Sequence, residues 1–112
     1  MSFQARLHHG TPRMVDYTPS SAVAAGDVVV LGTVPHVAHL DIAANRKGAL
    51  AAYGGVYQML AAAAIAVGKK VYWDDTANRI TETGTSNTAF GWSESAASGT
   101  DTNLYVLHQP QP

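Results

Sequence analysis

The sequence predicts an all-β fold: a small, single-domain β-sandwich or barrel with at most one short helical turn. The chain has 112 residues, 46% of them hydrophobic, which is enough for one core and too few for two independent domains. Short runs of β-branched and aromatic residues are separated, about every 8 to 12 residues, by turns that contain glycine, asparagine or aspartate. This pattern is typical of antiparallel sheets joined by short turns.

The clearest element is a hairpin within residues 66–81. Val71 and Trp73 alternate with Tyr72, as a half-buried, pleated strand requires. Residues 74–78 supply polar side chains that bond to their own backbone, and a second alternating strand follows them. We therefore predict two strands joined by a tight turn.

The other strands are predicted from the same signals. Val28–Leu31, for example, is a β-branched run too short for a helix, and we expect a core strand there. The strands predicted in this way are residues 13–17, 28–31, 56–60, 71–73, 79–81, 88–93 and 103–108.

Two segments carry mixed signals. Residues 34–40 contain Pro35, which cannot donate to a ladder, so this segment is predicted to be an edge strand or to begin after the proline. Residues 61–64 are four alanines, the one place where propensity favours helix. Because Gly68 stops any extension, we expect a single helical turn there.

The domain organisation follows from the same patterns. Residues 1–12 lack periodicity, and we predict a flexible N-terminal arm there. A single β-rich domain is predicted over residues 13–108, followed by a proline-containing tail at residues 109–112. The sequence shows no apolar signal-peptide core and no apolar run near the roughly 18 residues of a membrane span, so we expect neither export by a standard signal nor a membrane partner.

Composition also limits the function. A net charge of −1 with 13% charged residues argues against a nucleic-acid partner, because binding by counterion release requires clustered lysine or arginine. The absence of cysteine excludes disulfides, thiolate nucleophiles and cysteine-based zinc sites. The low charge and many small residues suit a surface that packs against other subunits.

Motifs for phosphate or metal binding are incomplete. Gly68-Lys69 resembles part of a phosphate-binding loop, but that loop needs a glycine where Ala63 stands and a serine or threonine where Lys70 stands. The five histidines include His36 and His39, whose spacing places them on opposite faces of a strand. We interpret the histidines as surface or edge residues and predict no metal site and no cofactor.

Candidate catalytic groups have simpler explanations. Asp74 and Asp75 lack the calcium-loop pattern and are interpreted as turn residues. Ser93 lies in a predicted strand and lacks the second glycine of a nucleophile elbow. Trp73 and Trp92 could stack on bases or sugars, but in a small β domain we expect them in the core. The sequence therefore predicts no catalytic residue and no enzyme.

A short internal likeness relates two turns. Residues 24–29, Ala-Ala-Gly-Asp-Val-Val, match residues 66–71, Ala-Val-Gly-Lys-Lys-Val. A duplication would produce this likeness, but so would two unrelated β-turns that lead into buried strands, and we favour the second explanation.

Five blocks of the chain carry a resemblance to a known family. They are residues 25–32, 55–57, 65–74, 79–81 and 90–91. In this order they resemble the small capsid cement, or head-decoration, proteins of tailed bacteriophages, a family once catalogued as a domain of unknown function. The resemblance runs from about residue 5 to about residue 107, and its most specific part is Gly-x-x-Val-Tyr-Trp-Asp at residues 68–74. Residues 34–40 and the Gln-Pro tail depart from the family pattern.

The resemblance implies a structural protein without catalysis or cofactor. It implies attachment to the outside of a phage head, with the major capsid protein as partner and a homo-oligomer, a trimer by preference, as the working form. The implied location is the outer capsid surface of the virion, with the host cytoplasm during assembly, and the coding sequence belongs to a phage or prophage. The alternative is a small non-enzymatic accessory or DNA-binding module of phage origin.

Specific residues are assigned to these roles. We expect the arm to contact the capsid or a neighbouring subunit through Arg6, His8, His9 and Arg13. The predicted structural core consists of Val29, Val71, Trp73, Phe90, Trp92 and Val106. A pH switch in assembly would use His36, His39 and His108.

Overall fold

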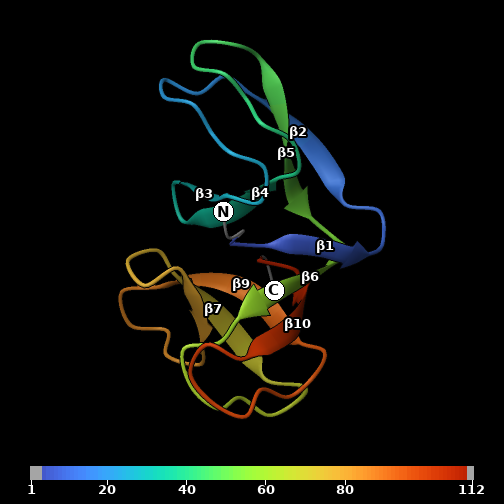
Figure 1. Cartoon of the computed structure of the whole chain (residues 1–112), viewed down its shortest axis with the longest axis vertical. Coiled ribbons are helices and arrows are strands. Elements are labelled where there is room, and N and C mark those ends of the chain that lie inside the picture. Colours follow the sequence, from blue (N-terminus) through green and yellow to red (C-terminus); the bar gives the residue numbers. More distant parts are fainter. Residues whose placement is uncertain (1–3, 111–112) are drawn as a thin grey trace.

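The computed structural model describes residues 4–110 and consists of two antiparallel β-sheets (Figure 1). No helix occurs in this range, so the prediction of an all-β, single-domain fold is confirmed. The strands are β1 (Arg6–His9), β2 (Arg13–Tyr17), β3 (Val28–Leu31), β4 (Val34–Ala38), β5 (Gly48–Tyr53), β6 (Val56–Leu60), β7 (Lys70–Asp74), β8 (Arg79–Thr81), β9 (Thr88–Ser93) and β10 (Asn103–His108).

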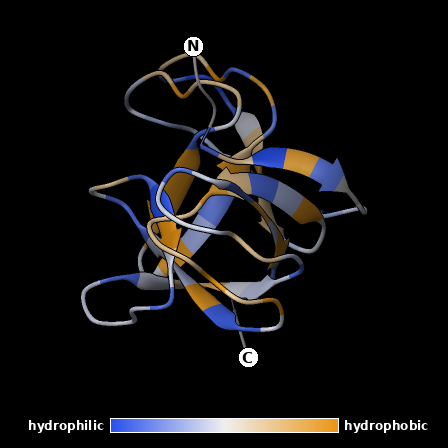
Figure 2. Cartoon of the chain, turned by 60° about the horizontal axis from the view of Figure 1, so that its bottom comes forward, coloured by the Kyte–Doolittle hydropathy of each residue, from blue (hydrophilic) through white to orange (hydrophobic). Residues whose placement is uncertain are grey.

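The four-stranded sheet is formed by the consecutive strands β2 to β5, whereas the six-stranded sheet combines β1 with β6 to β10. The four-stranded sheet has the order β2-β5-β4-β3, and the six-stranded sheet has the order β1-β6-β10-β9-β7-β8. In Figure 1 the four-stranded sheet lies above the six-stranded one. Hydrophobic and hydrophilic residues alternate along the strands, so each sheet has faces of different character (Figure 2).

The two sheets repeat one topology. The order β2-β5-β4-β3 of the first half corresponds to β6-β10-β9-β7 of the second. In each half a loop leads into the second strand through a glycine of positive φ, Gly26 at 89° and Gly68 at 80°. In each half a single bridge joins this same loop to the loop before the last strand, Val23 to Ile42 in the first half and Ile65 to Ala97 in the second. The likeness of the two turns in the sequence therefore extends to a whole structural repeat, to which the second half adds β8.

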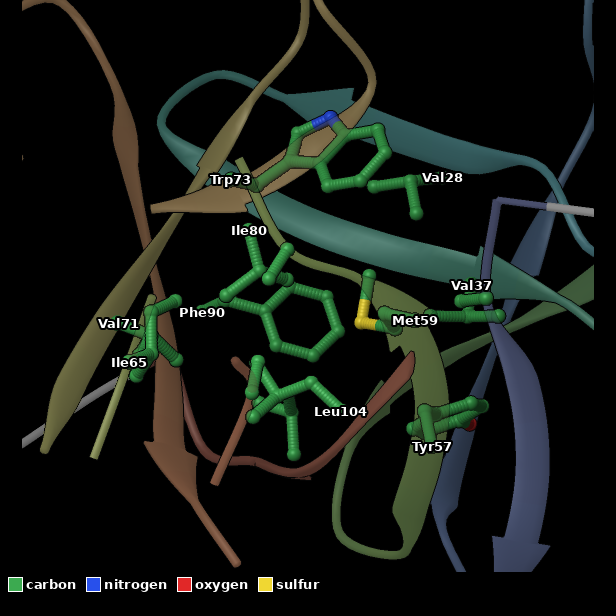
Figure 3. Close-up of a cluster of buried hydrophobic side chains, with 14 of the residues drawn as sticks. Val28, Val37, Tyr57, Met59, Ile65, Val71, Trp73, Ile80, Phe90 and Leu104 are labelled. Carbon is green, nitrogen blue, oxygen red and sulfur yellow. The ribbon is translucent and has the colours of Figure 1, made fainter. Parts of the chain in front are cut away.

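The main hydrophobic core lies between the sheets (Figure 3). Val28 and Val37 from the four-stranded sheet lie close to Trp73 and Met59 from the six-stranded sheet. A smaller cluster covers the other face of the four-stranded sheet and includes the half-buried Val29. Of the residues expected in the core, four are buried, namely Val71, Trp73, Phe90 and Val106.

The assignment of Trp92 to the core is wrong, because its side chain is 41% exposed. Alternation alone places Phe90 and Trp92 on one face. The pairing between β7 and β9 shifts, however, since Val71 pairs with Gly91 and Tyr72 pairs with Ala89. This bulge inserts Phe90 as an extra residue facing the core and reverses the phase, so that Trp92 points outward.

Part of the predicted arm is a strand. Arg6–His9 forms β1, which pairs with β6 at the edge of the six-stranded sheet. Just before it, the amide N–H groups of Gln4 and Ala5 both donate to the carbonyl of Gly26, at 3.0 and 2.8 Å. The arm predicted over residues 1–12 therefore contains the strand β1, whereas residues 1–3, and residues 111–112 of the predicted tail, lie outside the described range.

Both expectations for the proline segment are wrong, because β4 lies between β3 and β5 and includes Pro35. Pro35 is opposite Val30 of β3, but the pairing of β4 with β5 includes only Val37 and Ala38. The missing N–H of the proline therefore leaves no broken ladder bond on the β5 side. Its carbonyl accepts a hydrogen bond from Nε2 of His108 at 2.8 Å instead.

The expected helical turn is also absent, since the described residues 61–64 contain no helix. Ala61 forms a bridge to Ile80, and the N–H of Ala62 donates to the carbonyl of Ile80 at 2.8 Å. Contacts across the sheet thus outweigh the intrinsic helix propensity of four alanines.

The hairpin β7–β8 has the predicted turn chemistry. Oδ1 of Asp74 accepts hydrogen bonds from the N–H groups of Thr76 and Ala77, both at 3.0 Å. Asp75 accepts a hydrogen bond from the indole N–H of Trp73 at 2.9 Å. Asp74 therefore has the predicted turn role, whereas the contact that the structure gives to Asp75 is with a side chain.

Replacing Asp74 with alanine is expected to lower the free energy of unfolding by about 1 kcal/mol, because two turn N–H groups lose their acceptor. Urea denaturation measures the change. The control is Glu82→Ala, which removes the same charge at an exposed position and should change stability by less than about 0.5 kcal/mol. Equal losses in both variants would contradict the structural role of Asp74.

Candidate functional site

The predicted contact residues lie on two different sheets. Arg6 and His8 are exposed on β1, which also contains His9. Arg13 is exposed on β2, in the other sheet, and its guanidinium lies 6.0 Å from the ring centre of Tyr53. The structure therefore brings Arg6 and His8 to one surface and leaves Arg13 on another.

The ring of His8 stacks on Tyr105, with centroids 4.1 Å apart and an interplanar angle of 25°. Tyr105 is opposite Gln58 of β6, which is in turn opposite Arg6 of β1. Residues directly opposite each other in a sheet share a face. These four side chains therefore lie on the side of the six-stranded sheet that faces away from the core.

The same face continues across the sheet. Leu107 of β10 is opposite Trp92 of β9, which is opposite Lys70 of β7. We call this surface the outer face; it consists of Arg6, His8, Gln58, Lys70, Trp92, Tyr105 and Leu107. The outer face was not predictable from the sequence, because strand order and register depend on contacts between distant residues. The alternation within each strand is visible in the sequence.

A cluster of histidines joins the two sheets. His108 is buried on β10, where Nε2 donates to the carbonyl of Pro35 on β4. Its ring packs 4.5 Å from that of Phe90 and 5.6 Å from that of Tyr57, measured between centroids. Burial lowers the pKa of His108 to about 4, the Pro35 hydrogen bond opposes this shift, and the nearby His36 and His39 lower the pKa further. His108 is therefore neutral at pH 7.

The other two histidines occupy different environments. Nδ1 of the buried His36 donates to the carbonyl of Val34 at 3.0 Å. Nε2 of His39 lies 2.6 Å from the hydroxyl oxygen of Tyr57. Burial lowers the pKa of His39 and raises the pKa of Tyr57. The interpretation of the histidines as surface or edge residues is thus wrong for His36 and His108, which are buried on the central strands β4 and β10.

Carboxylates and surface hollows are the remaining candidate sites among residues 4–110. No group of three or more His, Asp or Glu side chains in that range could hold a metal ion. A hollow of about 500 Å³ lies beside the Val23–Ile42 bridge. Its carboxylates, Asp27 and Asp41, accept hydrogen bonds from the N–H groups of Ala24 and Ala25 and thus fix the loops.

The described part of the chain contains no helix of the length and hydrophobicity needed to cross a membrane.

Comparison with protein-family models matches residues 8–108 to a family described as phage cement protein. The chain belongs to the phage cement protein family. The resemblance based on the Gly-x-x-Val-Tyr-Trp-Asp block is therefore confirmed. Comparison with curated proteins and with solved structures gave no significant match. Membership indicates a structural role in a phage and association with a phage capsid.

Proposed function

We propose that this cement protein binds the outside of an assembled phage head and stabilises the capsid lattice. The observation that carries the proposal is the family match, which spans residues 8–108 and thus nearly all of both sheets. A cement protein needs a rigid body, and the two sheets provide one through a shared core. Asp27, Asp74 and His108 serve a loop, a turn and a sheet contact, which suits a non-enzymatic role.

The proposed partner is the major capsid protein, and the proposed working form is a homotrimer. Weak contacts become effective when they are repeated over a symmetric lattice, because linked binding events raise the overall affinity. Arg6, His8, His9 and Arg13 remain proposed contacts to the capsid or to a neighbouring subunit. Since β1 holds two of the exposed side chains, Arg6 and His8, within a sheet, these residues would dock as part of a preformed surface.

The test uses heads assembled without this protein. The purified protein is mixed with such heads, and bound protein is measured by co-sedimentation. We expect saturable binding, together with greater resistance of the heads to heat and to low ionic strength. Heads of an unrelated tailed phage are the control for specificity and should bind far less.

Two results would count against the proposal. The first is an absence of binding together with an unchanged resistance of the heads. The second is binding to DNA with a steep salt dependence, which the alternative of a DNA-binding accessory module predicts. Sedimentation equilibrium of the free protein tests the proposed trimer.

A further inference from the structure

The outer face of the six-stranded sheet combines an apolar centre with basic edges. Trp92, 41% exposed, and the half-buried Leu107 are neighbours on the central strands β9 and β10. Lys70 lies beside Trp92 on β7, and its ammonium group is 5.8 Å from the ring centre of Tyr72. Arg6 lies on the opposite side of the face, on β1. Aromatic residues surrounded by arginine and polar groups are the composition of protein interfaces.

This composition is unusual for a solvent-facing sheet surface. The outward positions of an exposed antiparallel sheet are normally polar, yet here tryptophan, tyrosine and leucine occupy adjacent strands. Three hollows of the described surface are lined by residues other than Trp92, Tyr105 and Leu107. An exposed sheet face with these residues at its centre fits a macromolecular surface rather than a small molecule.

The internal repeat provides an independent argument. In the second half, residues that are opposite one another on neighbouring strands form a row across the outer face. The equivalent strands of the first half contain a corresponding row. The second-half row is Lys70, Trp92, Leu107 and Val56. The first-half row is Val28, Val37, Ala51 and Met14.

The central residues of the two rows differ in exposure, although at the ends of the rows Met14 is exposed and Val56 is buried. Val28, Val37 and Ala51 are buried against the six-stranded sheet, where Val28 lies beside Trp73 (Figure 3). Lys70 and Trp92, at the equivalent positions, are exposed. The centre of this sheet face is thus an interface within the chain in the first half, whereas Lys70 and Trp92 are exposed in the second.

We propose that the outer face is the surface by which this protein docks on the capsid, and that the capsid surface it contacts presents carboxylates around an apolar patch. The proposal rests on the proposed function. Charge complementarity favours this occupant, because Arg6 and Lys70 lie at opposite sides of the apolar centre. Asp74, the acidic residue of β7, engages its carboxylate with the N–H groups of the hairpin turn. Glu94, whose N–H donates to the carbonyl of Tyr105, is exposed, and Arg6 and Lys70 outnumber it.

The experiment compares two outer-face variants with two matched controls. Trp92→Ala removes the aromatic centre, and Lys70→Glu reverses a charge at the edge. Leu40→Ala changes a residue that is 76% exposed in the first half, and Lys47→Glu reverses a charge at an exposed position there. Binding to heads that lack the protein is measured by co-sedimentation, and thermal unfolding checks that each variant folds.

We expect each outer-face variant to raise the Kd for heads by about tenfold or more, and each control to stay within about twofold of wild type. If wild-type protein binds heads and both outer-face variants bind equally well, the docking face is wrong and the proposed function stands. If wild-type protein does not bind, the proposed function itself fails. If Trp92→Ala does not fold, the binding of Lys70→Glu to heads tests the docking face by itself.

Two other outcomes are distinguishable. A loss of binding in Trp92→Ala with no effect of Lys70→Glu would overturn the assignment of an acidic partner surface. A variant that changes from oligomer to monomer in sedimentation equilibrium, yet binds heads as before, would show that the outer face joins copies of this chain and would overturn the proposal.

Discussion

Replacing Gly91 with alanine is expected to lower the free energy of unfolding by about 3 kcal/mol or more. A Cβ atom at Gly91 would lie 1.8 Å from the carbonyl oxygen of Leu107 and 2.9 Å from the amide nitrogen of Gln109. Both atoms belong to the backbone, so no side chain can rotate away and β10 itself must move. That movement would disturb the pairing of β9 with β10 and the buried Phe90. Urea denaturation measures the loss.

Gly99→Ala is the matched control. A Cβ atom there meets nothing within 4 Å, and Gly99 is outside the set of glycines with positive φ. The added methyl group should therefore leave stability unchanged or raise it by up to about 1 kcal/mol, because alanine restricts the unfolded chain. A Gly91→Ala protein within about 1 kcal/mol of wild type would mean that β9 and β10 do not approach this closely.

The strands were predictable where their signals are local. Val28–Leu31 and Asn103–His108 have the predicted bounds, because β-branched and aromatic runs between turn residues specify extended structure without reference to the rest of the chain. The hairpin turn at Asp74 was predictable for the same reason, since its carboxylate bonds to N–H groups two and three residues away.

The failures involve partners that are distant in the sequence. The segment of β1 is polar and has no clear alternation, and it forms a strand because it pairs with the edge of β6. Pro35 is tolerated in a central strand because β5 pairs only beyond it and His108, 73 residues away, takes its carbonyl. Ala61 extends toward Ile80 instead of starting a helical turn. In each case a tertiary contact overrides a local preference.

The candidate site was only partly predictable. Arg6 and His8 were assigned to contacts from their position in the chain, and the structure places them on the outer face. Trp92 was assigned to the core because it is two residues from Phe90, and a single bulge in β9 reversed that inference. A period of two indicates which residues share a face, but neither a bulge nor the covering of one face by another sheet is visible in the alternation.

Acidification is expected to destabilise the fold through His108. Its pKa is about 4 in the folded protein, against the ordinary value of 6.5. Because the unfolded chain binds the proton more tightly, stability is fully present above about pH 6.5 and decreases as the pH falls toward 4. The difference between the two pKa values corresponds to a loss of about 3 kcal/mol. Below about pH 4 the folded protein also binds the proton, and this contribution to the loss ends. Urea denaturation at intervals between pH 7 and pH 4 measures the slope.

His108→Gln separates this effect from the titration of carboxylates. A glutamine amide can donate to the carbonyl of Pro35, as Nε2 of the imidazole does, but it cannot gain a charge. We expect the variant to be less stable than wild type at pH 7, since it loses the ring contacts with Phe90 and Tyr57. Its stability should nevertheless fall much less between pH 6.5 and pH 4. Nδ1 of His108 has no hydrogen-bond partner, so a proton added there would be buried without an acceptor. Equal pH slopes for the variant and wild type would therefore show that the acid sensitivity arises elsewhere, with His39 as the next histidine to replace because its pKa is also lowered by burial.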